Sequence, residues 1–201
     1  MEQGYSTRYE IREATLADVP ELIRMQMTLQ SDMDNIRRNL LRPDRANIAH
    51  LREYYHSRIQ DEQTRLLVAM AVDSSKVVGM GTAKIWLHAD CLPARSGELI
   101  DVWVDPEHRG RRLARRIVSQ LLQFFRTNGI DFIIVSYVEG NRVGEGLWRR
   151  LGFEPVMATA TANRKDIERA LGIPAGCAAP PAYRSVLGGR TAARMASVPA
   201  G

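Results

Sequence analysis

The stretch Val104-Asp105-Pro106-Glu107-His108-Arg109-Gly110-Arg111-Arg112-Leu113-Ala114 decides the fold of this chain. It directly follows the strand-like run 98–103, and the segment after it has the apolar spacing of a helix. A turn at the start of a helix presents backbone N–H groups that have no partner inside the helix, together with the positive end of the helix dipole. Five arginines crowd this turn, at positions 109, 111, 112, 115 and 116. The stretch predicts an anion site that suits a pyrophosphate, although an ordinary basic turn would have the same composition.

A second informative stretch lies one expected strand further along the chain. It reads Asn141-Arg142-Val143-Gly144-Glu145-Gly146-Leu147-Trp148-Arg149-Arg150-Leu151-Gly152-Phe153. The first stretch resembles motif A of the GNAT acyl-CoA-dependent N-acetyltransferases, and the second resembles motif B, which ends in Leu-Gly-Phe. The matching residues are Val104, Pro106, Arg109, Gly110 and Ala114, then Asn141, Leu147, Leu151, Gly152 and Phe153. The motifs stand in the family's order, and the resemblance covers roughly residues 8–160.

Two positions depart from the family pattern. Arg112 stands where motif A usually has a glycine, which lets the backbone approach a phosphate closely. The resemblance implies that main-chain amides do most of the phosphate binding, so this arginine need not destroy the site. Trp148 stands at the motif B tyrosine, which is the family's usual general acid. Because an indole N–H is a donor but not an acid, we expect Trp148 to be a packing residue.

The apolar pattern predicts the element order β-α-α-β-β-β-α-β-α-β, which is the order that the resemblance implies. The expected strands cover 9–14, 66–72, 77–87, 98–104, 132–138 and 155–162, and residues 30–46 are expected to be irregular. Helices are expected from about residue 18 to 29, over 48–60, after Gly110 as far as Thr127, and over the motif B stretch. The expected fold class is therefore mixed α/β, a GNAT fold whose central, mostly antiparallel sheet contains a splayed parallel strand pair and is flanked by helices.

The composition bounds the domain organisation. We expect an N-terminal lead over 1–7, one domain over 8–162, a short helix over 163–173 and a disordered tail over 174–201. No uncharged apolar run approaches the ~18 residues that a membrane helix needs, and the N-terminus has no apolar signal core. These features predict a cytoplasmic protein with no membrane contact, in which Cys91 and Cys177 are reduced thiols.

The charge distribution argues against a nucleic-acid partner. The net charge is +5, but residues 155–201 carry +4 of it, so the expected domain is nearly neutral. There is no helix-turn-helix, zinc-finger or aromatic RNA-binding signature beside the arginines. The histidines and cysteines have no metal-binding spacing, so we expect no metal.

The resemblance implies a set of cofactor-binding residues for acetyl-CoA. Main-chain groups of Val102, Trp103 and Val104 would pair with the pantetheine arm, and one of their N–H groups would stabilise the oxyanion. The turn made of Arg109, Gly110, Arg111, Arg112, Leu113 and Ala114 would hold the pyrophosphate. Asn141 would either bond the cofactor arm or cap its own helix.

An attacking amine must lose a proton, because an alkyl ammonium has a pKa of about 10.4. Glu98 and Asp101 are the candidate bases. They are three residues apart, so a regular strand would place them on opposite faces of the sheet, whereas a bulge would change that. The alternative is that Asp101 only ties down a neighbouring loop.

The resulting hypothesis is an acyltransferase that moves an acetyl group from acetyl-CoA to a primary amine in a ternary complex. The alternative is a catalytically weak or inactive acyl-CoA-binding protein, favoured by Arg112 and Trp148. The acceptor would be an amine-bearing small molecule or peptide, and the protein a monomer or homodimer. Residues 30–62 would wall the acceptor site, where Asp32 and Asp34 would either attract a cationic amine or be solvated.

Overall fold

The computed structural model describes residues 8–37 and 48–173. The chain divides into two compact units, Met1–Val156 and Met157–Gly201, which are described separately. The predicted lead over 1–7 and the predicted tail over 174–201 lie outside the described residues, so these two predictions stay open. No described helix is long and apolar enough to cross a membrane.

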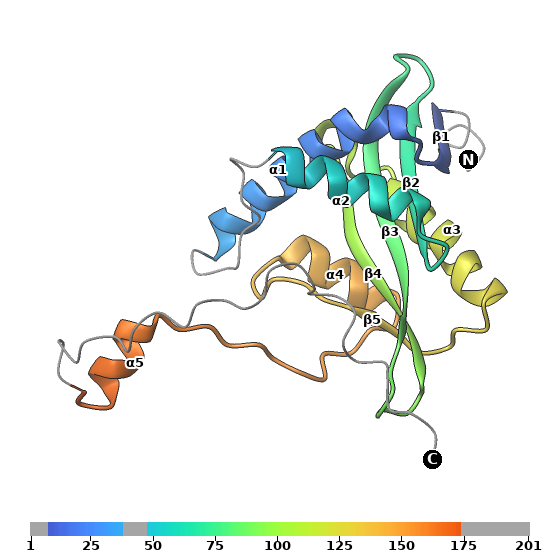
Figure 1. Cartoon of the computed structure of the whole chain (residues 1–201). Coiled ribbons are helices and arrows are strands. Elements are labelled where there is room, and N and C mark those ends of the chain that lie inside the picture. Colours follow the sequence, from blue (N-terminus) through green and yellow to red (C-terminus); the bar gives the residue numbers. More distant parts are fainter. Residues whose placement is uncertain (1–7, 38–47, 174–201) are drawn as a thin grey trace. The chain divides into compact units, whose positions relative to one another are not determined.

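The first unit is built on a five-stranded mixed sheet (Figure 1). Its strands are β1 (Tyr9–Glu13), β2 (Thr64–Ala71), β3 (Lys76–Leu87), β4 (Arg95–Val104) and β5 (Ile133–Val135), and they lie side by side in chain order. Strands β1 to β4 pair antiparallel, and β5 alone runs parallel to its neighbour β4. The predicted fold class, a mostly antiparallel sheet with one parallel pair, is confirmed.

Helices cover both faces of this sheet. The α-helices are α1 (Val19–Ile36), α2 (Ile48–Gln60), α3 (Leu113–Thr127) and α4 (Arg142–Arg150), and the 3-10 turns are η2 (Leu16–Asp18) and η3 (Pro106–His108). Asp18 fixes the entry to α1. Its carboxylate accepts hydrogen bonds from the Thr15 N–H at 2.8 Å and from two nitrogens of Arg12 at 2.8 and 2.9 Å.

Two apolar layers form the core, one on each side of the sheet. Successive residues of β2 alternate between them: Leu66 and Val68 pack with α1 and α2, whereas Leu67 and Ala69 face α3. The apolar stripe predicted for α3 is buried as expected: Leu113, Ile117, Leu121 and Phe124 are all at most 9% exposed. Helices α1 and α2 therefore cover one face of the sheet and α3 covers the other.

Strand β4 contains a bulge that reverses this alternation. Met80 pairs with Trp103 and Thr82 pairs with Ile100, so two residues of β4, Asp101 and Val102, stand opposite the single residue between Met80 and Thr82. Asp101 has a φ of 53°, in the left-handed region. In a regular strand, side chains on the same face are an even number of positions apart. Across this bulge they are an odd number of positions apart.

Three expectations about element bounds are wrong. The irregular region predicted over 30–46 is wrong in its first part, because α1 continues to Ile36. Ser31, Asp32 and Asn35 have low helix propensity, so contacts and not propensity hold the helix there. Gln30 bonds Asp34 one turn on, at 3.2 Å, and Asp32 Oδ2 lies 3.4 Å from Trp103 Nε1. The strand predicted over 132–138 shrinks to Ile133–Val135, and it is not buried, because Phe132 and Ile134 are 53% and 39% exposed.

The strand predicted over 155–162 is absent: these residues have no regular secondary structure. Val156 and Met157 are adjacent, so they would point to opposite faces of a strand, and both are almost fully exposed. Pro155 has no N–H to donate, and the alanines that follow have low strand propensity. In the described part of the second unit, the regular element is the short helix α5 (Arg164–Ala170), which Asn163 caps at Lys165 N.

Candidate active site

The parallel strands β4 and β5 pair over only three residues. Gly97 stands opposite Ile133 and Leu99 opposite Val135, and no further register pair follows. The bulge at Asp101 begins two residues later, so β4 turns away from β5 at this point. Val102, Trp103 and Val104, the residues predicted to pair with the pantetheine arm, therefore lie just past the end of the pairing, where the main chain of β4 has no strand beside it on this side in the described part of the chain.

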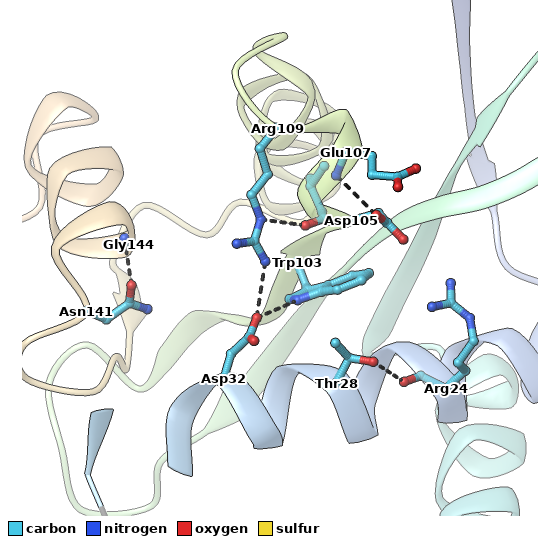
Figure 2. Close-up of polar contacts among 10 residues, drawn as sticks. Arg24, Thr28, Asp32, Trp103, Asp105, Glu107, Arg109, Asn141 and Gly144 are labelled. Atoms are coloured by element: carbon cyan, nitrogen blue, oxygen red, sulfur yellow. Dashed lines mark hydrogen bonds and ion pairs between the residues drawn. The ribbon is translucent and has the colours of Figure 1, made fainter. Parts of the chain in front are cut away.

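The turn before α3 has the backbone expected of an anion site. Asp105 accepts a hydrogen bond from Glu107 N at 3.2 Å and starts η3 (Figure 2). Gly110 then has a φ of 76°, and Arg112, immediately before α3, has a φ of 57°. Arg112 thus occupies a left-handed position, which explains why a glycine would be favoured there. The N–H groups that open α3 have no partner within the helix.

The arginine side chains of the turn are largely used within the protein. Arg109 Nε donates to the Val104 carbonyl at 2.9 Å, and its Nη2 lies 3.2 Å from Asp32 Oδ2 (Figure 2). Arg111 Nη1 donates to Tyr9 Oη at 2.8 Å. Leu113 belongs to the core. The geometry thus leaves phosphate binding to the main chain of Gly110–Ala114 more than to these side chains.

Asp32 lies on α1, and its carboxylate pairs with Arg109 of the turn before α3. Its Oδ2 also lies 3.4 Å from Trp103 Nε1, so it joins the helix to both the strand and the turn. The sequence left open whether Asp32 and Asp34 attract a cationic amine or are solvated, and it did not predict the ion pair of Asp32 with Arg109. This ion pair joins residues 77 positions apart, for which no local pattern exists.

The motif B helix α4 begins at Asn141, whose side chain accepts from Gly144 N at 3.1 Å (Figure 2). The helix-capping alternative for Asn141 is therefore confirmed, and a bond from its side-chain amide to the cofactor arm remains a prediction. Trp148 is 6% exposed and packs edge-on against Phe153, with ring centroids 5.6 Å apart. Its predicted packing role is confirmed.

The bulge brings Glu98 and Asp101 to the same face of the sheet. Leu99 and Val104 are five residues apart, yet both side chains pack on the α3 face of the sheet. The bulge between them therefore reverses which side chains of β4 point to which face. Glu98 precedes Leu99 and faces the other side, where its Oε2 accepts from Trp86 Nε1 at 2.8 Å. Asp101 lies on that side too, because its carboxylate interacts with Gln26 of α1 and Arg58 of α2.

The environment of Asp101 raises the proton affinity of its carboxylate. Burial raises the pKa of Asp101 above its usual value, and the charge of Glu98 adds to the rise. The nearby Arg58 and the side-chain amide of Gln26 act in the opposite direction without cancelling the effect of burial. A carboxylate with a raised pKa binds a proton more readily than an exposed one, which is what a general base requires.

Residues of α1 and α2 that sequence reasoning missed surround Asp101. Tyr55 is 1% exposed and its Oη donates to Gln26 Oε1 at 3.2 Å. Arg58 stacks over Tyr54, with Cζ 4.6 Å from the ring centroid. Burial raises the pKa of Tyr54 to about 12, so its phenol keeps its proton at neutral pH. The available signal in the sequence was that both tyrosines share one helix face with Leu51 and Ile59. That pattern indicates a packed face and not a site.

Among residues 8–37 and 48–173, no group of three or more histidine, cysteine, aspartate or glutamate side chains is arranged to hold a metal ion.

Curated mycothiol acetyltransferases are similar over part of their length: that of Thermobispora bispora is 31% identical over 84 residues, and that of Beutenbergia cavernae 35% over 79. These matches cover 42% and 39% of this chain but only 28% and 26% of the relatives, so the chain matches about a quarter of their length.

A crystal structure of a predicted acetyltransferase with acetyl-CoA from Clostridium acetobutylicum has the same fold. The TM-score is 0.65 at 14% identity, over 79% of this chain and 97% of that one. The model of the acetyltransferase (GNAT) family matches residues 33–153, which include the bulged strand, the turn before α3 and both motifs. This chain belongs to the GNAT family of acetyltransferases.

Proposed function

We propose that this protein is an N-acetyltransferase that moves an acetyl group from acetyl-CoA to a primary amine by direct attack in a ternary complex. The C–N bond of the product amide forms, the thioester C–S bond breaks, and CoA leaves as the thiol. The observation that carries the proposal is the bulge at Asp101. It places two carboxylates on one sheet face at the point where β4 separates from β5.

The residues of the turn and of β4 fit acetyl-CoA as the acyl donor. The left-handed Gly110 and Arg112 shape a turn that opens into α3, and the first N–H groups of the helix suit a pyrophosphate. Val102–Val104 would pair with the pantetheine arm, since β5 does not extend alongside them. An N–H of this segment would stabilise the oxyanion that develops when the amine attacks.

Asp101 is the general base in this proposal, acting directly or through a water molecule. Burial raises the pKa of the Asp101 carboxyl, whereas the carboxylate of Glu98 is hydrogen-bonded to the Trp86 indole. Only the ionised carboxylate can accept a proton, so the rate should rise with pH as Asp101 deprotonates. Because Trp148 is an indole packed in the core, the departing thiolate would take its proton from water or from the ammonium product.

Amide variants of the two carboxylates test the proposal. With acetyl-CoA and an amine panel, thiol release should fall by ~10²–10⁴ in kcat for Asp101→Asn, the usual effect of losing a general base. Glu98→Gln makes the same chemical change at the other candidate base on the same sheet face; its kcat should fall less than tenfold, and a large loss in this variant alone would make Glu98 the base. Acetyl-CoA should raise the melting temperature of both variants as in the wild type.

The outcomes separate the alternatives. Stabilisation by acetyl-CoA without thiol release to any amine would favour an inactive acyl-CoA-binding protein, for which the missing motif B acid at Trp148 is the supporting observation. No stabilisation at millimolar acetyl-CoA would contradict the assignment of the acyl donor. Losses below tenfold in both variants would mean that another group or bulk water deprotonates the amine.

A further inference from the structure

The β3–β4 hairpin extends beyond the end of α2 (Figure 1). The hairpin and the neighbouring β5 region carry exposed apolar side chains. Trp86 on β3 is 40% exposed, and Phe132 and Ile134 at β5 are 53% and 39% exposed. Large apolar side chains that gather on one open surface beside polar groups mark binding sites more often than scattered ones do.

Strand register places these three side chains on the same face as Glu98. Glu98 stands opposite Lys84 of β3 on one side and Ile134 of β5 on the other. Trp86 is two residues from Lys84 in β3. Phe132 is two residues from Ile134, just before β5, and its carbonyl still accepts from Gly97 N at 2.9 Å as a strand residue would. Both side chains therefore point to the face of Glu98. The exposed patch is therefore continuous with the carboxylate pair.

The indole of Trp86 is held in place beside the carboxylate. Its Nε1 donates to Glu98 Oε2 at 2.8 Å, and Lys84 Nζ lies 4.5 Å from the ring centroid. Lys84 in turn pairs with Asp61 at 3.7 Å. A ring that is fixed in this way loses little conformational entropy when a ligand packs against its exposed part.

We propose that Trp86, Phe132 and Ile134 bind an apolar substituent of the acceptor, which makes the acceptor a primary amine whose neighbouring group is flat and apolar, such as an arylalkylamine. The amino group would face Glu98 and Asp101, and the apolar group would lie on the patch. This inference rests on the proposed N-acetyltransferase activity, because it assigns the acceptor side of the same site.

Two amines of similar basicity test it: phenethylamine, which carries the apolar ring, and ethanolamine, which does not. Thiol release from acetyl-CoA by the full chain should show a KM for phenethylamine roughly tenfold or more below that for ethanolamine. The reason is that packing on the exposed indole removes roughly 60–100 Å² of apolar surface from water. Trp86→Ala should abolish most of this difference.

Leu87→Ala is the matched control. Leu87 is the next residue of β3, is 64% exposed and points to the opposite face, so its loss should leave the preference intact. A wild type that uses both amines equally well, or a Trp86→Ala variant that keeps the preference, would overturn the inference.

A binding measurement separates this inference from the proposed function. In the presence of CoA, calorimetry should detect the product N-acetylphenethylamine more readily than N-acetylethanolamine, and Trp86→Ala should weaken the first but not the second. If no amine of the panel releases thiol and this binding preference is still seen, the proposed activity fails and the apolar site stands. If the products bind equally, the apolar site is wrong whatever the activity.

Discussion

The left-handed backbone at Arg112 makes a quantitative prediction for the cofactor turn. Arg112 has φ 57° and ψ 15° immediately before α3. This conformation costs a residue with a Cβ about 1–2 kcal/mol, whereas glycine avoids the cost but loses about 0.5–1 kcal/mol more conformational entropy on folding. Arg112→Gly should therefore be about 0.7 kcal/mol more stable than Arg112→Ala, since both variants remove the same charge and only one removes the Cβ.

Urea unfolding of the two variants, with the slope of the transition unchanged, measures this difference directly. Acetyl-CoA titration should then show that Arg112→Gly binds at least as tightly as Arg112→Ala, because a turn without a Cβ lets the main chain approach a phosphate more closely. An alanine variant that is equally stable or more stable would refute the strain argument. It would also remove the physical reason for a glycine at this position.

Two further predictions concern stability. The pKa of Asp18 is lowered, chiefly by hydrogen bonds from Arg12, so its contribution to stability is present above about pH 4 and is lost as pH falls through the lower pKa of the folded state. Asp18→Asn should lower the free energy of unfolding by about 2 kcal/mol at pH 7, and less in acid, as urea unfolding across pH would show. Trp148→Phe should cost about 1 kcal/mol or more through lost packing while kcat falls little, and a folded variant that binds CoA but loses ~10³-fold in kcat would give the indole a direct role.

The parts of the fold that the sequence predicts well are those with a local cause. The stripe of α3 and its glycine end, the helix over 48–60 and the β2–β3 hairpin follow from spacing and turn residues within a few positions. The turn before α3 belongs to this class too, because motif A encodes it residue by residue. Even the left-handed position of Arg112 is marked in the sequence, by the glycine that the family pattern has there.

The parts that the sequence predicts poorly depend on partners that are distant in the chain. The bulge at Asp101 was foreseen only as a possibility, because its position is set by pairing with β3, and its effect on Glu98 needs the sheet. The length of β5 depends on where β4 bends away, and a strand over 155–162 would need an edge to pair with. The surroundings of Asp101 come from Gln26 on α1 and from α2. The two tyrosines of α2 look like ordinary core residues in a helical pattern.

The contact between Arg109 and Asp32 leads to a last prediction. Charge reversal at Arg109 would weaken acetyl-CoA binding both by repelling the phosphates and by disrupting the turn. The turn would change because the guanidinium donates to the Val104 carbonyl and pairs with Asp32. Asp32→Asn changes the ion pair with Arg109 but leaves the bond from Arg109 to the Val104 carbonyl, and it removes a negative charge near the proposed pyrophosphate site. The paired side chains are 42% and 39% exposed, so the ion pair contributes at most about 1 kcal/mol and the variant should fold normally.

Asp32→Asn should therefore bind acetyl-CoA up to about fivefold more tightly at low salt, and the gain should disappear at high salt because exposed charges are screened. Calorimetric titration at two ionic strengths measures both effects. If Asp32→Asn instead binds acetyl-CoA more weakly at both, then Asp32 serves the site by holding Arg109 and Trp103 in position. The carboxylate on α1 would then be part of the cofactor site and not an electrostatic obstacle to it.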